Sequence, residues 1–161
     1  MTTGAKIPTA TAAEEFLADL LGTGVTARVC TPQQLREGQC SYLASYGPAR
    51  GEVAALAVTD LQLATAMATA ISGMPADETR ERVRAEGALV HELPDFHRQV
   101  LEVAARLFGG PVQSQFSLVD CRPVPGQVHR SAASLARAPR RRSDWALAID
   151  GHGEGLLTVL A

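Results

Sequence analysis

Two apolar runs separated by a short segment of glycine and proline constrain the fold of this chain more than any other feature. CSYLASYG, residues 40–47, and EVAALAVT, residues 52–59, are joined at GPARG, residues 47–51. Apolar runs divided by a Gly/Pro turn are typical of a β-hairpin. We therefore expect neighbouring antiparallel strands, not parallel strands linked by helices.

The chain of 161 residues is long enough for one domain. Residues 1–10 are small and polar, and we expect a flexible arm there, followed by a single domain over residues 11–161. Thr11 and Glu14 resemble a capping box, which predicts the start of a helix. VTARVC, residues 25–30, alternates apolar and polar residues as a half-buried strand does.

Two helices are predicted after the hairpin. Asp60 is a suitable cap for the first helix, and Gly73 and Pro75 mark its end. Residues 76–87 are charged on all sides and form either a solvated helix or a loop. The second long helix is predicted over residues 94–108, where Pro94 suits a first turn.

The C-terminal part is predicted to contain three strands, over residues 112–121, 144–150 and 155–160. Residues 122–143 between the first two are polar and basic, which favours a mobile loop, and residues 150–155 form a tight hairpin loop. The order α-β-β-β-α-α-β-β-β predicts an α+β fold, in which two long helices pack on a mostly antiparallel sheet.

Composition narrows the class of protein. The formal net charge of -2 gives no overall attraction to nucleic acid or to anionic membranes. No apolar run is long enough to span a membrane, and the N-terminus lacks the pattern of a secretion signal. Cys30, Cys40 and Cys121 are odd in number and far apart, as reduced thiols are. We expect a soluble cytoplasmic protein.

The sequence gives little support for a metal site, a cofactor site or a hydrolase active site. His91 and His97 are six residues apart, the wrong spacing for one helical face, so a metal site with Glu92 is disfavoured. His129 and His152 fall in predicted loops, where turn chemistry is the expected role. The chain has no phosphate-binding glycine loop and no GxSxG motif. We expect no bound metal and no cofactor.

Glu102 is the most interesting charge of the second long helix. The residues predicted to share the buried face are Phe96, Val100, Val103, Ala104 and Leu107. Glu102 lies about 160° from Val100 around the helix axis, so it is expected to point outward. Arg98 and Arg106 each stand four residues away, within reach of its side chain. Glu102 is either a working carboxylate or one more charge on a solvated face.

Taken in order, these segments resemble the CheC/CheX chemotaxis phosphatase superfamily, in its single-repeat, CheX-like form. The resemblance is carried by EEFLADLLG, ALAVTDLQLATAMATAISGMP, DFHRQVLEVAARLFGG and SQFSLVDCRPVP, which cover most of the chain. It implies removal of phosphate from the aspartyl phosphate of a response regulator. The family signature is a helical Glu-x-x-Asn, whose carboxylate grips a lysine of the regulator and whose amide orients a water molecule.

The family signature is incomplete in this chain. Glu102 occupies the glutamate position, but the residue three further on is Ala105, whose methyl group cannot orient water. The chain contains no asparagine that a shifted alignment could supply. Arg98 stands where the family usually has Asp or Ser. Gln99 offers an amide, but three residues on the other side of Glu102.

The leading hypothesis is a non-catalytic CheX-like domain for protein interaction or dimerisation in bacterial signalling. Its partner would be a response-regulator receiver domain or another signalling protein, and Arg98 and Arg106 beside Glu102 are candidate contacts. The resemblance also implies a homodimer paired through sheet edges. The first alternative is an enzyme, a divergent phosphatase that uses Glu102 with Gln99 or with a group supplied by the partner. Enzymatic activity therefore stays open, and its absence is favoured.

The second alternative concerns RAPRRR, residues 137–142, which concentrates positive charge in the predicted loop. A solvated loop is the favoured interpretation of this segment. Otherwise, Arg140, Arg141 and Arg142 are candidates for binding an acidic protein surface or nucleic acid. Nucleic acid is the less favoured of the two, because the chain lacks a recognisable nucleic-acid module and only Trp145 is near enough to stack on a base.

Overall fold

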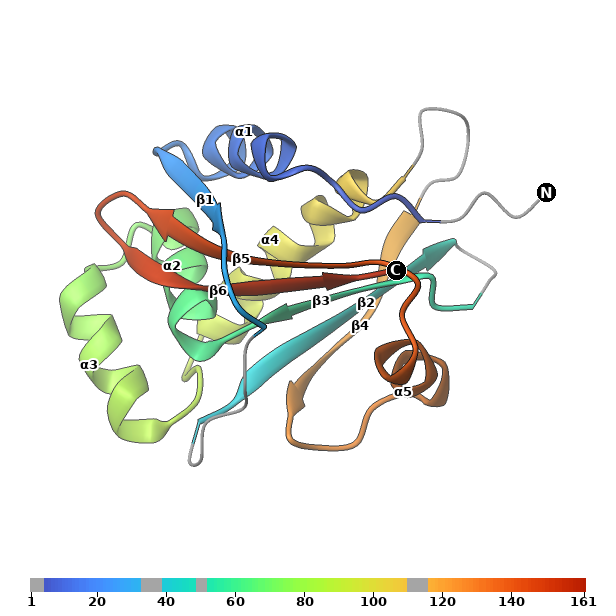
Figure 1. Cartoon of the computed structure of the whole chain (residues 1–161). Helices are drawn as coiled ribbons and strands as arrows, with labels where there is room; N and C mark the ends of the chain where they lie inside the picture. Colours follow the sequence, from blue (N-terminus) through green and yellow to red (C-terminus); the bar gives the residue numbers. More distant parts are fainter. Residues whose placement is uncertain (1–4, 33–38, 49–51, 110–115) are drawn as a thin grey trace.

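The computed structural model describes residues 5–32, 39–48, 52–109 and 116–161. These residues form a six-stranded sheet in which every neighbouring pair is antiparallel, in the order β1-β5-β6-β3-β2-β4 (Figure 1). The strands are β1 Val25–Val29, β2 Ser41–Pro48, β3 Ala55–Thr59, β4 Phe116–Val124, β5 Arg142–Ile149 and β6 Gly153–Leu160.

The helices lie on both sides of this sheet, in unequal numbers. They are α1 Ala10–Leu21, α2 Leu61–Ser72, α3 Ala76–Glu86, α4 Leu93–Ala104, the short 3-10 helix η1 Ala105–Leu107, and α5 Arg130–Arg137. Helices α1, α2 and α4 cover one face, and α3 lies outside α2, while α5 lies against the opposite face (Figure 1). The predicted α+β architecture is confirmed.

Side-chain alternation along the strands divides the core into two layers. Ala44, Ala57 and Val159 point toward α1, α2 and α4 in the main core. Their chain neighbours Leu43, Leu56 and Leu160 point the other way and pack with Ala132 of α5, which forms a smaller core. Both faces of the central strands are therefore buried.

The predicted hairpin and the first helix after it are confirmed. Strands β2 and β3 pair from Tyr42 opposite Thr59 to Tyr46 opposite Ala55, while residues 49–51 of the turn lie outside the described residues. The Asp60 carboxylate caps α2 by accepting the N–H of Leu63 at 2.9 Å.

The predicted capping box at the N-terminus is wrong. The cap of α1 is Thr9, whose Oγ1 accepts the N–H of Ala12 at 3.1 Å, and Thr11 lies inside the helix. The carboxylate of Glu14 instead accepts the N–H of Ala27 in β1 at 2.6 Å. Thr9 is a preferred N-cap residue type, although the residue three after it is Ala12 and completes no capping box. The division into a flexible arm and one domain stays a prediction.

The predicted mobile loop over residues 122–143 is also wrong. Strand β4 continues to Val124, α5 occupies the middle of the segment, and β5 begins at Arg142. Ala132 is fully buried and Leu135 packs beside it on the sheet, which holds α5 in place. The charged segment 76–87 is the helix α3, and residues 112–115 of the predicted fourth strand lie outside the described residues.

Buried polar bonds fix α4 on the sheet. The hydroxyl of Tyr46 donates to the carbonyl of Leu101 at 2.8 Å, and Thr59 Oγ1 lies 3.0 Å from Nε2 of His97. Burial lowers the pKa of His97 to about 4, so the imidazole is neutral in the folded protein. These bonds set which side of α4 faces solvent.

The buried arc of α4 differs from the predicted one. Its buried residues are Leu93, His97, Val100, Leu101 and Ala104. Phe96, Val103 and Leu107 are only half-buried, because His97 and Leu101 take the central positions against the sheet. A histidine satisfied by an internal hydroxyl can occupy a core position that apolarity alone does not predict.

Candidate functional site

The outer face of α4 is the candidate site, because it carries Glu102. The exposed residues of this face are Asp95, Arg98, Gln99, Glu102 and Arg106. Arg106 belongs to η1, which continues α4 with a tighter winding. The structure therefore brings together Arg98, Gln99 and Glu102, as the sequence predicts, and places Arg106 beyond the end of the α-helix.

The Glu102 carboxylate already has a cationic partner. Arg98 Nε lies 3.2 Å from Glu102 Oε1, and the two side chains are 46% and 53% exposed. An exposed pair four residues apart on a helix contributes only about 0.3–0.5 kcal/mol. The pair is weak enough to open for a partner, but in the free protein the carboxylate is held by its own chain.

Ala105 points into the core and not beside Glu102. Helix α4 ends at Ala104, and the tighter winding of η1 begins at Ala105, which is 3% exposed. Its neighbours include Phe108, which belongs to the same core. The position at which the resemblance implies a water-orienting amide therefore holds a buried methyl group.

Gln99 is the remaining amide on this face. It is exposed one turn before Glu102, so both side chains project from the same side of α4. Its amide group can donate and accept hydrogen bonds. The order of amide and carboxylate along the helix is the reverse of that in the family signature.

Cys121 of β4 lies near this face and was not singled out from the sequence. Burial raises the pKa of its thiol to about 11, while the nearby Arg98 guanidinium acts in the opposite direction. The thiol is therefore protonated at neutral pH and is a poor nucleophile.

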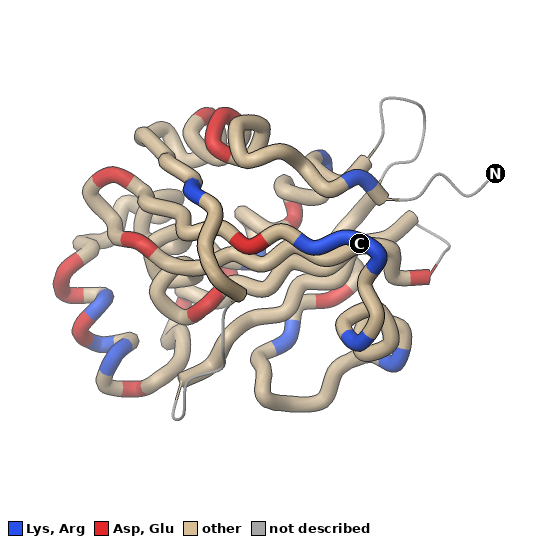
Figure 2. The backbone as a smooth tube through the Cα atoms, in the orientation of Figure 1, with Lys and Arg blue, Asp and Glu red and all other residues tan. Residues whose placement is uncertain are grey.

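The arginine-rich segment is built into the sheet and is not a free loop. Arg142 binds Asp144 through two bonds of 2.8 and 3.0 Å, which raise the pKa of its guanidinium. The backbone of Arg141 exchanges two hydrogen bonds with Ala161. Basic segments lie beside the C-terminus and on α5 (Figure 2). Arg140 and Arg141 keep exposed side chains, and their predicted role in binding is untested.

The residues considered for a metal site are separated by the structure. His91 is exposed, whereas His97 is buried. Within the described ranges, no three His, Cys, Asp or Glu side chains gather closely enough to hold a metal ion. The described part of the chain also contains no helix with the length and apolar character needed to cross a membrane.

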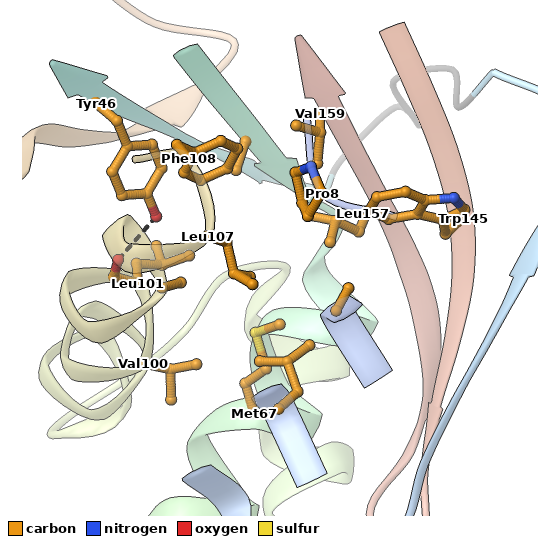
Figure 3. Close-up of a pocket in the computed structure, with 14 residues that line it drawn as sticks. Pro8, Tyr46, Met67, Val100, Leu101, Leu107, Phe108, Trp145, Leu157 and Val159 are labelled. Atoms are coloured by element: carbon orange, nitrogen blue, oxygen red, sulfur yellow. Dashed lines mark hydrogen bonds between the residues drawn. The ribbon is translucent and has the colours of Figure 1, made fainter. Parts of the chain in front are cut away.

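An apolar cavity of about 30 Å³ lies under α4 (Figure 3). Side chains from α1, α2, α4 and the sheet surround it, including Met67, Val100 and Leu157, and the Tyr46 hydroxyl is engaged by Leu101. This volume admits little more than a water molecule, and it offers that water no free polar partner. The cavity is a packing gap and not a ligand site.

A wider groove runs along α5. Its volume is about 720 Å³, and its lining includes Val119, His129 and Ser131. His129 Nδ1 lies 2.8 Å from Ser131 Oγ, and the same nitrogen accepts the backbone N–H of Ser131. This geometry belongs to a helix cap on the surface, so it does not indicate an activated serine.

Several solved structures are similar to this chain at low sequence identity. The FliM middle domain of Vibrio alginolyticus matches with a TM-score of 0.57 at 13% identity, over 94% of this chain and 87% of its own. FliM in the FliM–SpeE complex of H. pylori matches with a TM-score of 0.53 at 10% identity, over 94% and 80%. A CheX chemotaxis protein of Desulfovibrio desulfuricans gives 0.43 at 14%, over 92% and 93%.

These matches define the class of protein at the level of fold. The chain has the fold of the FliM middle domain, which agrees with the α+β architecture expected from the sequence. At such low identity, the likeness concerns the backbone arrangement and not the site. No protein-family model and no curated protein matches the sequence.

Proposed function

We propose that this chain is a non-catalytic, CheX-like interaction domain of bacterial signalling that binds a protein through the outer face of α4. Two observations on the residues of the predicted site support this proposal most directly. Glu102 is held by Arg98, and Ala105 is buried in the core. Without an exposed amide three residues after Glu102, the site lacks the group that orients water in the family signature.

The proposed partner is a receiver domain of a response regulator. Arg98, Gln99 and Glu102 give the outer face of α4 one cation, one amide and one anion within a single turn. Such a mixed polar face can exchange its weak internal ion pair for ion pairs with a partner. FliM, which has a similar fold, also binds another protein, since the H. pylori structure is a complex of FliM with SpeE.

The proposal is tested by measuring binding and turnover with the same receiver domains. Candidate domains, phosphorylated with a small phosphodonor, are titrated against the wild-type protein, and phosphate release is followed in parallel. We expect binding without accelerated release, and at least tenfold weaker binding for the double variant R98A/E102A. R82A on the exposed side of α3 is the matched control. Accelerated release by the wild type contradicts a non-catalytic role.

A divergent phosphatase is the alternative, and one observation favours it. Gln99 and Glu102 are both exposed and one turn apart on α4, so an amide and a carboxylate share one face. Under this alternative, phosphate release occurs in the wild type and is lost in both Q99A and E102A. Release that persists in both variants assigns the activity to other residues.

Dimerisation through a sheet edge is a further part of the proposal. The two edge strands are β1 and β4. Strand β4 carries a register irregularity opposite Ser45 and Tyr46, and Pro123 near its end, both of which disfavour pairing with another strand. Strand β1 has neither feature and ends at Val29, which is 81% exposed. We infer that a second copy pairs with β1.

A further inference from the structure

A small polar pocket lies between α2 and α3 and contains no residue of α4. Its volume is about 50 Å³. Its lining comprises the apolar Leu61 and Val83 and the polar Gln39, Gln62, Thr65, Arg80 and Arg84. None of these lining residues is acidic. The pocket therefore presents two guanidinium groups without a carboxylate of its own.

Arg80 has a buried donor that no protein group accepts. Its Nη2 binds Asp77 Oδ1 at 3.0 Å, and Asp77 is almost fully exposed, so this pair lies at the surface. The Nε of Arg80 is buried and has no hydrogen-bond partner among the described residues. The guanidinium carbon lies 4.0 Å from the point that a Cβ on Gly153 would occupy, so the end of the β5–β6 hairpin is close to it. A buried N–H without an acceptor costs free energy, which an anionic ligand would offset.

The other polar groups of the pocket also supply donors. Arg84 follows Arg80 by one helical turn, so both guanidinium groups project from the same side of α3. Gln62 Nε2 donates to Gln39 Oε1 at 3.3 Å, which uses one amide proton of Gln62 and leaves the amide protons of Gln39 for another acceptor. Thr65 donates its hydroxyl proton to the carbonyl of Leu61 at 2.7 Å. The pocket therefore has more donors than acceptors.

We propose that this α2–α3 pocket binds one phosphate-sized oxyanion, either inorganic phosphate or the phosphoryl group of a small phosphomonoester. Arg84 and the unpartnered Nε of Arg80, whose Nη2 already binds Asp77, can offer N–H donors to the oxygens of such an anion. The volume of about 50 Å³ fits one such group and is too small for a whole nucleotide. This site is separate from the outer face of α4, so it does not depend on the proposed function.

Binding at this site would hold α3 against α2. Helix α3 buries only Thr79 and Val83, and most of its surface is charged and exposed. An oxyanion held by Arg80 and Arg84 on one side and by the Gln39–Gln62 pair on the other would bridge the two helices. We expect slower hydrogen exchange of the α3 amides in the presence of phosphate.

The experiment measures binding of inorganic phosphate and of glycerol phosphate by isothermal titration calorimetry, with potassium chloride matching the ionic strength. Hydrogen exchange of α3 is followed under the same conditions. R80M and R84M remove the two guanidinium groups, and R82M is the control, because Arg82 is exposed and does not line the pocket. We expect both pocket variants to bind at least tenfold more weakly than the wild type, and R82M to bind like the wild type.

The outcomes separate the two sources of the oxyanion. Tighter binding of glycerol phosphate assigns the pocket to a phosphomonoester, and equal or weaker binding assigns it to the free ion. Equal loss of affinity in R82M, unchanged affinity in R84M, or no phosphate binding by the wild type overturns the proposal. Because Arg84 is exposed, R84M keeps the test valid even if R80M fails to fold.

Discussion

Thr59 Oγ1 and His97 Nε2 lie 3.0 Å apart in the interior between β3 and α4, with the ring of Tyr42 edge-on to the imidazole at 5.2 Å. Burial lowers the pKa of His97 from 6.5 to about 4. The unfolded chain therefore takes up this proton at higher pH than the folded protein does. The contribution to stability is complete above about pH 6.5 and is lost as the pH falls through about 4.

We expect His97 to make the free energy of unfolding fall by about 3 kcal/mol between pH 7 and pH 4. Urea denaturation of the wild type and of H97Q across this range measures the effect. Glutamine keeps a hydrogen-bonding group near Thr59 and does not titrate, so the difference between the two proteins isolates the imidazole. Parallel pH profiles for both proteins would show that His97 is not protonated on unfolding.

Introducing the Glu-x-x-Asn signature by A105N should fail to create a phosphatase. Ala105 is 3% exposed, so an asparagine there buries an amide in an apolar core and does not stand beside Glu102. We expect a loss of about 1–3 kcal/mol in stability, with no gain in phosphate release from phosphorylated receiver domains. A gain of release in A105N would mean that η1 can unwind and turn this position outward.

Local patterns predict much of this fold, and tertiary contacts decide the rest. The β2–β3 hairpin and the Asp60 cap depend on residues close in sequence, and both are confirmed. Helix α5 is short, and its stability comes from packing Ala132 on Leu43 and Leu56, which lie far away in the chain. No periodicity within residues 130–137 could reveal that contact.

The candidate site likewise combines features that the local sequence predicts with features that depend on tertiary structure. The outward direction of Glu102 follows from helical spacing and is observed. The burial of Ala105 depends on the change from α to 3-10 winding after Ala104, and the burial of His97 depends on the hydroxyl of Thr59 across the core. Neither a change of winding nor a distant hydroxyl is visible in the local sequence of the helix.

Removing the Tyr46 hydroxyl should weaken the attachment of α4 to the sheet. Tyr46 is fully buried and donates to the carbonyl of Leu101 at 2.8 Å, so Y46F leaves that carbonyl without its donor. We expect a loss of about 1–2 kcal/mol in the free energy of unfolding, measured by urea denaturation. Y42F is a matched comparison, because it removes the acceptor of the Leu89 N–H. A stability equal to that of the wild type would show that water replaces the bond.

Filling the apolar cavity should stabilise the protein. Val100 lines this cavity of about 30 Å³ on the inner side of α4, and V100I adds one methyl group of comparable size (Figure 3). We expect a gain of about 0.5–1 kcal/mol, seen as a higher midpoint of urea denaturation with an unchanged slope. V100A enlarges the cavity and should cost about 1–3 kcal/mol. A loss of stability in V100I would mean that the added methyl group strains the helix packing.

The proposed dimer should depend on β1 and not on β4. V29E places a charge on the exposed end of β1, where a paired strand would bury it, whereas V119E places the same charge on β4. A charge on an edge strand opposes pairing with another chain. In sedimentation equilibrium, we expect V29E to weaken dimerisation at least tenfold and V119E to leave it unchanged. The reverse result would assign the dimer to β4, and a wild type that stays monomeric at high concentration would exclude pairing at both edges.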